Sequence, residues 1–484
     1  MSSFWLGWGD NFYSCRMISL SDLAVPTAPA PLDLELIRKY AVPGPRYTSY
    51  PPANRFNEDL EALDIESAIA TDNGNAARPL SLYFHLPFCE SRCWYCGCTT
   101  IITRRRDWAY AYLDDLAREI ELVSNKINPE RLVSQLHFGG GTPTFFPPDA
   151  LKRLGDEIHR RFKFTEDAEL SVEIDPRHAT SEHIAALRAM GMNRASLGVQ
   201  DTNPIVQKAI HRVQSNEINR TTVARLRDAG IKAINFDLIY GLPLQTPETV
   251  ATTVDEVLEL APDRLSVFSY AHVPWMKPAQ RIFDQRGEMP DPEMKLAMFG
   301  VMREKLLAAG YVDVGLDHFA RPDDELALAK RNRALHRNFQ GYSTRSGASL
   351  YGLGISSISQ TDEIYRQSPK SLVPYRASLK AGQLPVERGY RLTAEDHRRR
   401  RLIMAVMCER RLDFRRLSDE LNCDVKSVYA PELDSLESLI SDGLIEISPE
   451  ALRVLPRGEP LLRVVAMAFD QTLAPSVRAH ALTV

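Results

Sequence analysis

The sequence contains few cysteines, no long apolar segment and no marked excess of charge of one sign. Only seven of its 484 residues are cysteine, which is too few for a small secreted fold held together by disulfides. The 59 lysine and arginine residues are offset by 63 aspartate and glutamate residues, so the chain lacks the basicity typical of nucleic-acid-binding proteins. No apolar run approaches the ~20 residues that a membrane-spanning helix needs. We therefore expect a soluble, cytoplasmic protein with no nucleic-acid or membrane partner.

The amino terminus lacks the pattern of a secretion signal. Residues 1–15 have neither a basic start nor a continuous apolar core. Residues 24–31 are rich in proline and alanine, a composition typical of a flexible tether. We expect residues 1–36 to be a disordered extension, or an artefact of start-site assignment with Met17 as the true beginning.

What the chain does have is a group of closely spaced cysteines. Cys89, Cys93 and Cys96 form a C-x3-C-x2-C pattern directly after a strand-like stretch at residues 80–86, and Cys98 follows at once. Three thiolates in one loop suit an iron–sulfur cluster, which normally takes four cysteines. If only three are supplied, one iron stays open to bind a small molecule.

Two other interpretations of this loop are a structural zinc site and a disulfide. Structural zinc sites usually use two well-separated C-x2-C pairs or add histidines, and Cys408 and Cys423 lie far from the loop and from each other. Disulfides are disfavoured in a reducing cytoplasm. The pattern therefore favours the cluster over both.

Strand-like and helix-like segments alternate from residue 80 to about residue 268, as in parallel βαβ units. We predict strands near residues 80–86, 133–138, 169–175, 194–199, 233–238 and 264–268. Only about six units precede a change of pattern, so the expected fold is α/β, a partial (β/α)6 TIM-like barrel. A mostly helical, winged-helix-like C-terminal domain should follow. The expected divisions are 37–79 for an N-terminal arm over the barrel mouth, 80–333 for the barrel and 334–484 for the C-terminal domain.

Side chains alternate between the two faces of a strand, and the predicted strands have one apolar and one polar face. The apolar faces should pack against helices, which leaves the polar set inside the barrel: Tyr83, His85, Ser171, Glu173, Asp175, Ser196, Gly198, Gln200, Asn235 and Asp237. An ordinary TIM barrel is plugged with branched aliphatic side chains, whereas unpaired buried polar groups cost roughly 1–3 kcal/mol each. The pattern therefore predicts a polar guest inside the barrel, unless these strand faces are exposed to solvent.

A glycine run, Gly139–Gly141, ends the second predicted strand and precedes Thr142 and Pro143. Glycines at such a place let the backbone approach a ligand and donate its N–H groups. By itself the run would fit a tight turn equally well, and its position beside the cysteine loop favours a binding loop.

The cysteine loop, with Tyr95 before its third cysteine, resembles that of the radical S-adenosylmethionine superfamily. Within it, the chain resembles the oxygen-independent coproporphyrinogen III oxidase family from about residue 37 to about residue 473. The motifs that carry this resemblance are PGPRYTSYP (43–51), CGC (96–98), GGGTPT (139–144), FDLIYGLPLQTP (236–247), DHFARPDDELA (317–327) and HRNFQGY (336–342).

The resemblance implies one 4Fe–4S cluster and two bound S-adenosylmethionine molecules. Cys89, Cys93 and Cys96 would hold the cluster. The positions that match contacts of the first S-adenosylmethionine are Tyr83, Tyr95, Gly140, Glu173 and Ile358. Those that match contacts of the second are Gly141, Thr142, Gln200, Arg212, Asp237 and Ala271. Cys98, where the related haem chaperones carry phenylalanine, would be a catalytic residue that is not a cluster ligand.

The implied reaction is the oxidative decarboxylation of two propionates of coproporphyrinogen III to vinyl groups, which gives protoporphyrinogen IX for haem biosynthesis. It would need an electron donor and an electron acceptor that the sequence does not identify, in a protein expected to be a monomer. The alternatives are a haem-binding chaperone on the same scaffold and a relative that acts on another tetrapyrrole.

Two further regions give weaker hypotheses. Arg46, Tyr47 and Tyr50 could bind substrate propionates if the arm folds over the barrel mouth, or the arm could simply cover apolar surface. The four arginines at 398–401 lie among acidic residues, so we interpret them as a solvated helix face rather than as a DNA-binding surface. A lid over the barrel mouth is the expected role of the C-terminal domain.

Overall fold

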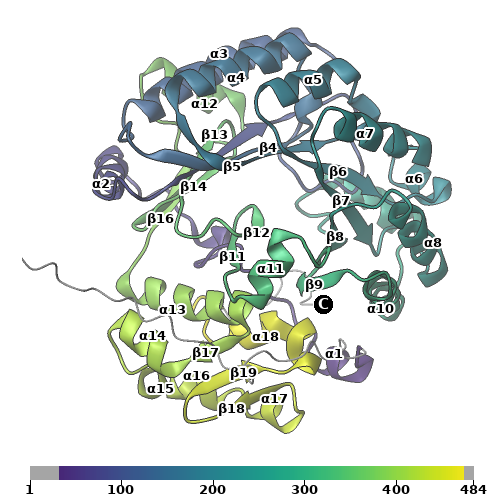
Figure 1. Ribbon diagram of the computed structural model, residues 1–484, viewed down its shortest axis with the longest axis vertical. Coiled ribbons are helices and arrows are strands. Elements are labelled where there is room, and N and C mark those ends of the chain that lie inside the picture. The colour runs from purple at the N-terminus through teal and green to yellow at the C-terminus, as the bar shows by residue number, and fades with distance from the viewer. Residues whose placement is uncertain (1–31, 474–484) are drawn as a thin grey trace, which may run out of the picture.

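The computed structural model describes residues 32–473, and its largest element is a sheet of 12 strands. Seven adjacent strands are parallel and form an arch (Figure 1). In spatial order they are β13 (Ser349–Leu353), β1 (Leu80–Leu86), β4 (Leu132–Gly140), β5 (Lys163–Ile174), β6 (Arg194–Gln200), β7 (Ala233–Tyr240) and β8 (Arg264–Ser269). The six predicted strands and the partial barrel are confirmed.

Helices cover the outer face of the arch (Figure 1). They are α3 (Asp107–Ser124), α4 (Pro148–Arg161), α5 (Ser181–Ala189), α6 (Pro204–Ala209), α7 (Asn216–Asp228), α8 (Pro247–Leu258) and α10 (Pro292–Ala308). The apolar strand residues, such as Leu82 and Phe84, are fully buried in one core with Leu116 and Ile120 of α3. The apolar faces thus pack outward against the helices, and the polar faces point into the arch.

Four strands beyond the predicted end of the barrel also belong to the large sheet. β13 pairs in parallel with β1, and the antiparallel strands β14 (Ile358–Gln360), β15 (Ile364–Gln367) and β16 (Arg388–Arg391) extend that edge. The expected boundary at residues 333 and 334 is therefore corrected, because the sheet continues to Arg391. These strands are short and mostly antiparallel, so the sequence there shows no regular alternation of strand-like and helix-like segments. At the other edge lie the antiparallel strands β10 (His318–Ala320) and β9 (Val312–Gly315).

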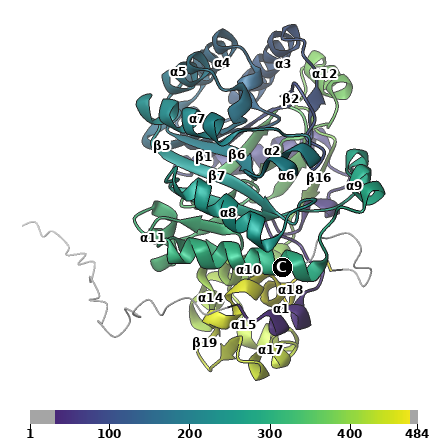
Figure 2. The same ribbon diagram turned by 90° about the vertical axis from the view of Figure 1, so that its right-hand side faces the viewer.

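The C-terminal domain lies across the open side of the arch (Figures 1 and 2). Its helices are α13 (Ala394–Met404), α14 (Phe414–Leu421), α15 (Val425–Val428), α16 (Ala430–Asp434), α17 (Glu437–Ser441) and α18 (Leu462–Met467). A three-stranded antiparallel sheet of β17 (Arg411–Asp413), β19 (Ala451–Val454) and β18 (Ile445–Ile447) completes it. This winged-helix-like arrangement has its own hydrophobic core. Each of the four arginines at 398–401 lies within ion-pair distance of a carboxylate.

The N-terminal arm bridges both parts of the molecule. The helix α1 (Leu34–Tyr40) begins after Asp33, whose carboxylate accepts the backbone N–H of Leu36 at 3.1 Å. Residues 34–36 are therefore helical. This corrects the C-terminal end of the expected disordered extension, residues 1–36. Residues 1–31 and 474–484, including the Met17 alternative, lie outside the described part of the chain. The helix α2 (Ala62–Asn73) packs on the barrel core. No helix among the described residues is both long and apolar enough to cross a membrane.

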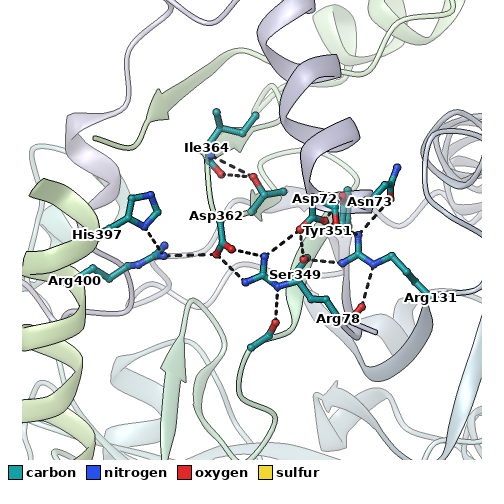
Figure 3. A network of polar contacts seen from close by, with 12 residues as sticks. Asp72, Asn73, Arg78, Arg131, Ser349, Tyr351, Asp362, Ile364, His397 and Arg400 are labelled. Carbon is teal, nitrogen blue, oxygen red and sulfur yellow. Dashed lines mark hydrogen bonds and ion pairs between the residues drawn. The ribbon is translucent and has the colours of Figure 1, made fainter. Parts of the chain in front are cut away.

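A network of polar side chains, buried at Asp72 and Arg131 and exposed at Asp362, connects the arm with the sheet and the C-terminal domain (Figure 3). Asp72, at the end of α2, accepts from Arg131 Nη1 at 2.6 Å, Ser349 Oγ at 2.6 Å and Tyr351 Oη at 2.8 Å. Its other contacts reach Arg78, which binds Asp362, and Asp362 in turn lies 3.9 Å from Arg400 of α13. The network therefore fixes how the arch and the C-terminal domain are joined.

Candidate active site

A cavity of about 460 Å³ lies inside the arch. The side chains that line it include the polar faces of the parallel strands: Tyr83, His85, Gln135, His137, Ser171, Glu173, Arg194, Ser196, Asn235, Asp237, Arg264 and Ser266. Strand register brings these residues together, since Tyr83 is opposite His137, and Glu173 is opposite Ser196. The polar lumen predicted from strand alternation is therefore a real cavity.

Three carboxylates line the cavity, and Glu169 is paired with Arg194 at 3.2 Å, so Glu173 and Asp237 define the electrostatics of the rest. Glu173 accepts from the backbone N–H of Gly140 at 3.2 Å and lies 3.2 Å from His137 Nε2. Burial alone would raise the pKa of Glu173, but these two partners lower it below its usual value. Asp237 accepts from Ser196 at 2.8 Å and Asn235 at 2.9 Å, and burial raises its pKa to about 6. Arg194 and Arg264 line the cavity as well, but they pair with Glu169, Asp324 and Glu325. This leaves the negative charge of Glu173 and Asp237 to favour a cationic guest.

The glycine run brings the end of β4 against the cysteine loop. Gly140 has φ of 116°, and a Cβ there would lie 2.8 Å from the His85 ring. Gly141 donates its N–H to Leu86 O at 2.8 Å, and a Cβ there would lie 2.5 Å from Phe88 O. The close approach of His85 and Phe88 thus requires glycine at both positions. The run lets the end of β4 pack against the cysteine loop, and it is also a candidate ligand-binding loop.

The cysteine loop lies at the carboxyl ends of the strands. Cys93 Sγ faces two guanidinium groups, Arg212 at 3.6 Å and Arg177 at 3.7 Å. The Cys98 thiol beside Cys96 lowers the pKa of Cys96 to about 6. Cations next to a readily ionised thiol suit a site that binds metal through thiolates. The donor set of this loop therefore fits an iron–sulfur cluster.

The two other interpretations of the loop fit less well. All six cysteines among residues 32–473 are free, so the disulfide interpretation is wrong for them. In the same part of the chain, no three His, Cys, Asp or Glu side chains lie close enough together to hold a single metal ion.

Arg212 connects the cysteine loop to the strands. It donates to Asp175 Oδ2 at 3.0 Å and to Gly198 O at 2.6 Å, in addition to its contact with Cys93. Its Nε is buried and has no partner among the described residues. A buried donor of this kind is costly unless a ligand or water satisfies it. Gln200 lies nearby, because its amide and the guanidinium of Arg212 both approach Gly198.

The structure divides the predicted site residues into two groups. Six line the cavity: Tyr83, Cys98, Gly140, Glu173, Asp237 and Ile358. The others surround the cysteine loop at the rim: Tyr95, Gly141, Thr142, Gln200, Arg212 and Ala271. Gln280 joins two of these, since its Nε2 donates to Tyr95 O at 3.0 Å and to Ala271 O at 3.4 Å. Thr142 Oγ1 accepts from the backbone of Asp175 at 3.3 Å.

Sequence reasoning missed several residues of the cavity. Gln135 and His137 alternate along the second strand, so sorting its two faces would have found them. Arg194 and Arg264 begin their strands and form ion pairs with Glu325 at the other end of the cavity. Glu325 belongs to a helix outside the parallel units, so strand alternation gives no signal for this ion network.

The hypothesis for the N-terminal arm is partly corrected. Tyr47 and Tyr50 are buried in the core of the C-terminal domain, so they cannot line an open entrance. Arg46 forms an ion pair with Asp317 and places its guanidinium over the ring of Phe268, which lines the cavity. Of the three residues, only Arg46 remains next to the site.

Comparisons with known proteins agree with this geometry. Residues 83–257 match the radical SAM superfamily, and residues 392–461 match the HemN C-terminal domain. The chain is 44% identical to the oxygen-independent coproporphyrinogen III oxidase of Pseudomonas aeruginosa, over 91% of this chain and 96% of that protein. The corresponding Escherichia coli protein is 42% identical, over 92% and 96%. A solved structure of E. coli coproporphyrinogen III oxidase, described as a radical SAM enzyme, matches with a TM-score of 0.87 and 41% identity, over 92% of this chain and 100% of that one.

Proposed function

The chain belongs to the oxygen-independent coproporphyrinogen III oxidase family of the radical SAM superfamily, and from this we propose roles for its residues. It is an oxidoreductase that decarboxylates two propionates of coproporphyrinogen III to vinyl groups, giving protoporphyrinogen IX in haem biosynthesis. Its cofactors are a 4Fe–4S cluster and S-adenosylmethionine, two molecules of which are consistent with the family. The observation that carries the proposal is the juxtaposition of three thiols with a cavity lined by the carboxylates of Glu173 and Asp237.

We assign the cluster to Cys89, Cys93 and Cys96. When bound, the cluster would supply the one-electron reduction of S-adenosylmethionine on which the reaction depends. The guanidinium groups of Arg212 and Arg177 lie 3.6 Å and 3.7 Å from Cys93 Sγ and place positive charge beside the loop. The charged groups of the loop and its two arginine neighbours therefore lie at the rim of the cavity, next to the polar strand faces.

The cavity would hold the first S-adenosylmethionine through Tyr83, Gly140, Glu173 and Ile358, with Tyr95 at the rim. Glu173 is the anionic partner for this cation, and His137 and the Gly140 N–H fix its two oxygens. The second molecule would lie toward the rim, against Gly141, Thr142, Gln200, Arg212, Asp237 and Ala271. The cover provided by the C-terminal domain keeps water away from the cavity, which protects a radical reaction.

Cys98 is proposed to act in turnover without holding the cluster. It is the one cysteine of the loop that lines the cavity, and its thiol lies beside Cys96. We expect a Cys98→Ala protein to keep the iron content and visible absorbance of the wild type while losing turnover. A Cys93→Ala protein is the matched control and should lose the cluster. Loss of iron in Cys98→Ala would overturn this role.

The remaining partners follow from the reaction. An electron donor must reduce the cluster, and an acceptor must take the electron left after each decarboxylation. We further propose a cytoplasmic monomer that does not bind nucleic acid, with residues 37–79 as an arm beside the barrel mouth. The ion pairs made by the arginines at 398–401 support the absence of DNA binding, because their charge is already compensated.

The function is tested by anaerobic incubation of reconstituted protein with coproporphyrinogen III, dithionite, S-adenosylmethionine and a one-electron acceptor. Release of carbon dioxide with formation of protoporphyrinogen IX is the expected result. Haem binding without turnover would instead identify a chaperone, and decarboxylation of a different tetrapyrrole would identify a relative with another substrate.

A further inference from the structure

Three segments that are distant in sequence meet around the outer side of the cysteine loop. Trp94 N–H donates to Ile210 O at 3.0 Å, and His211 Nδ1 lies 2.8 Å from Arg92 O. Gln280 connects Tyr95 with the segment after β8. Residues 90–106, 204–213 and 271–286 therefore form one surface, which we call the rim face. The helices α6 and α9 (Arg281–Arg286), which belong to it, lie on the same edge of the barrel in Figure 2.

The rim face is strongly basic, in contrast to the rest of the chain. Its three segments contain nine lysine and arginine residues but only two acidic residues, whereas the whole protein has a net charge of −4. Of these nine, Arg212 is buried against Asp175, and Arg105 and Arg286 pair with Asp107 and Glu288 just outside the segments. Both acids, Glu90 and Asp284, already have basic partners. Arg92, Lys208 and Arg281 are exposed, and no carboxylate of the described residues lies within ion-pair distance of them.

Exposed apolar side chains lie among these charges. Ile205, Val213, Trp275 and Met276 are each about two-thirds exposed. Large apolar residues that remain in water, surrounded by polar groups, mark interaction sites. Tryptophan, methionine and arginine are also enriched in protein–protein interfaces. The composition of the rim face therefore fits the docking of another protein that carries negative charge.

Trp94 gives this face a direct relation to the cluster. It stands between Cys93 and Cys96 in the loop, and its indole ring stacks on His211 with 5.1 Å between centroids. The guanidinium of Arg286 lies 5.1 Å from the same ring on the rim face. A protein bound at this surface would therefore contact the segment that carries both cysteines.

We propose that the rim face docks an acidic one-electron carrier protein, which reduces the cluster from the side of Trp94. In this step the carrier is oxidised by one electron and the cluster is reduced by one, and no bond or proton changes. The inference rests on the proposed function, since only a protein that holds the cluster needs this electron. Apart from Cys98 and Thr99, no residue of the rim face lines the cavity. The substrate is also anionic, but it must reach the cavity, so an acidic protein fits the rim face better than the substrate does.

Calorimetric titration of the anaerobic holoenzyme with oxidised flavodoxin, an acidic FMN protein, tests the docking separately from activity. The test variant is the double substitution Lys208→Glu and Arg281→Glu, because both side chains are exposed and lie outside the cysteine loop. The matched control is Lys152→Glu, an equally exposed lysine on α4, which belongs to no segment of the rim face.

We expect the double variant to weaken flavodoxin binding by about tenfold at low salt, and salt to weaken binding to the wild type but not to the double variant. Its iron content and its turnover with dithionite should equal those of the wild type. Equal binding to wild type and double variant would overturn the proposal. A raised KM for coproporphyrinogen III with dithionite would overturn it in favour of a substrate site. Absence of dithionite-driven turnover in the wild type would instead refute the proposed function.

Discussion

His137 holds Glu173 from one side and Tyr83 from the other. Its Nε2 lies 3.2 Å from Glu173 Oε1, and its ring stacks on that of Tyr83 with 5.8 Å between centroids and 12° between planes. Its Nδ1 lies 2.6 Å from Ser171 Oγ, which fixes the orientation of the ring. One side chain thus sets the positions of two residues proposed to bind the first S-adenosylmethionine.

Replacing His137 should weaken the binding of S-adenosylmethionine. His137→Phe keeps an aromatic ring against Tyr83 but removes the partner of Glu173, so the pKa of Glu173 should rise and its carboxylate should lose orientation. We expect affinity to fall about tenfold, a loss typical of one hydrogen bond to a charged group, with partial recovery in His137→Gln. Anaerobic calorimetry measures both variants. His159→Gln, which changes a histidine of α4 bonded to Met190 O, should bind as the wild type does; unaltered affinity in His137→Phe would refute the positioning role.

Asp237 should make cofactor binding depend on pH. Its pKa in the free protein is raised from 3.8 to about 6, first by burial and then by repulsion from Glu173. A cationic ligand favours the ionised form, so affinity should fall as the pH decreases through 6 and should level off above 7. The pKa of Glu173 is lowered, so that group stays ionised in this window. Asp237→Asn should remove the dependence; a wild-type affinity that is constant from pH 5 to 8 would contradict the assignment.

The same shift has the opposite consequence for the unliganded fold. Because the pKa of Asp237 is higher in the folded protein than in the unfolded chain, this group stabilises the fold at low pH, and that contribution is lost as the pH rises through 6. Asp237→Asn should therefore unfold at an equal or higher temperature than the wild type at pH 7 in the absence of ligand. Thermal scans of the two proteins at pH 5 and pH 7 provide the comparison.

The glycine run should control assembly of the cluster as well as ligand binding. A Cβ at position 141 would lie within 2.5 Å of Phe88 O and 2.7 Å of the Pro87 carbonyl carbon, both backbone atoms just before Cys89. Gly141→Ala must therefore displace the start of the cysteine loop, and we expect reconstitution to yield clearly less iron. Gly97→Ala is the control inside the loop itself, since no atom lies within 4 Å of its Cβ position. Equal iron in the two variants would show that the loop tolerates the displacement.

Local periodicity accounts for what could be predicted from the sequence. Tyr83, Glu173 and Asp237 were placed in one lumen because side chains alternate along a strand, and the cysteine loop was recognisable from spacing alone. The same alternation would have revealed His137. The pairing of β13 with β1, the cover provided by the C-terminal domain and the ion pair between Arg46 and Asp317 depend on contacts between residues far apart in the chain. No local pattern specifies such contacts, so only the folded structure reveals them.

The network of Figure 3 should contribute strongly to stability through one ion pair. The side chains of Asp72 and Arg131 are 1% and 0% exposed, with 2.6 Å between Oδ2 and Nη1. Asp72→Ala leaves a buried guanidinium without its counter-charge, so we expect the free energy of unfolding to fall by about 3–5 kcal/mol. Denaturant titration of the reconstituted protein measures it. Asp114→Ala, which breaks the exposed pair with Arg153, should change stability little.

A double variant separates the charge from the packing. Removing both partners in Asp72→Asn with Arg131→Met leaves no uncompensated charge, so it should be less destabilising than Asp72→Ala even though it alters two buried residues. If the double variant is instead the less stable protein, the main role of the network is the hydrogen bonding of Asp72 to Ser349 and Tyr351. Tyr351→Phe then tests that role directly, because it deletes one of these hydrogen bonds and leaves the ion pair in place.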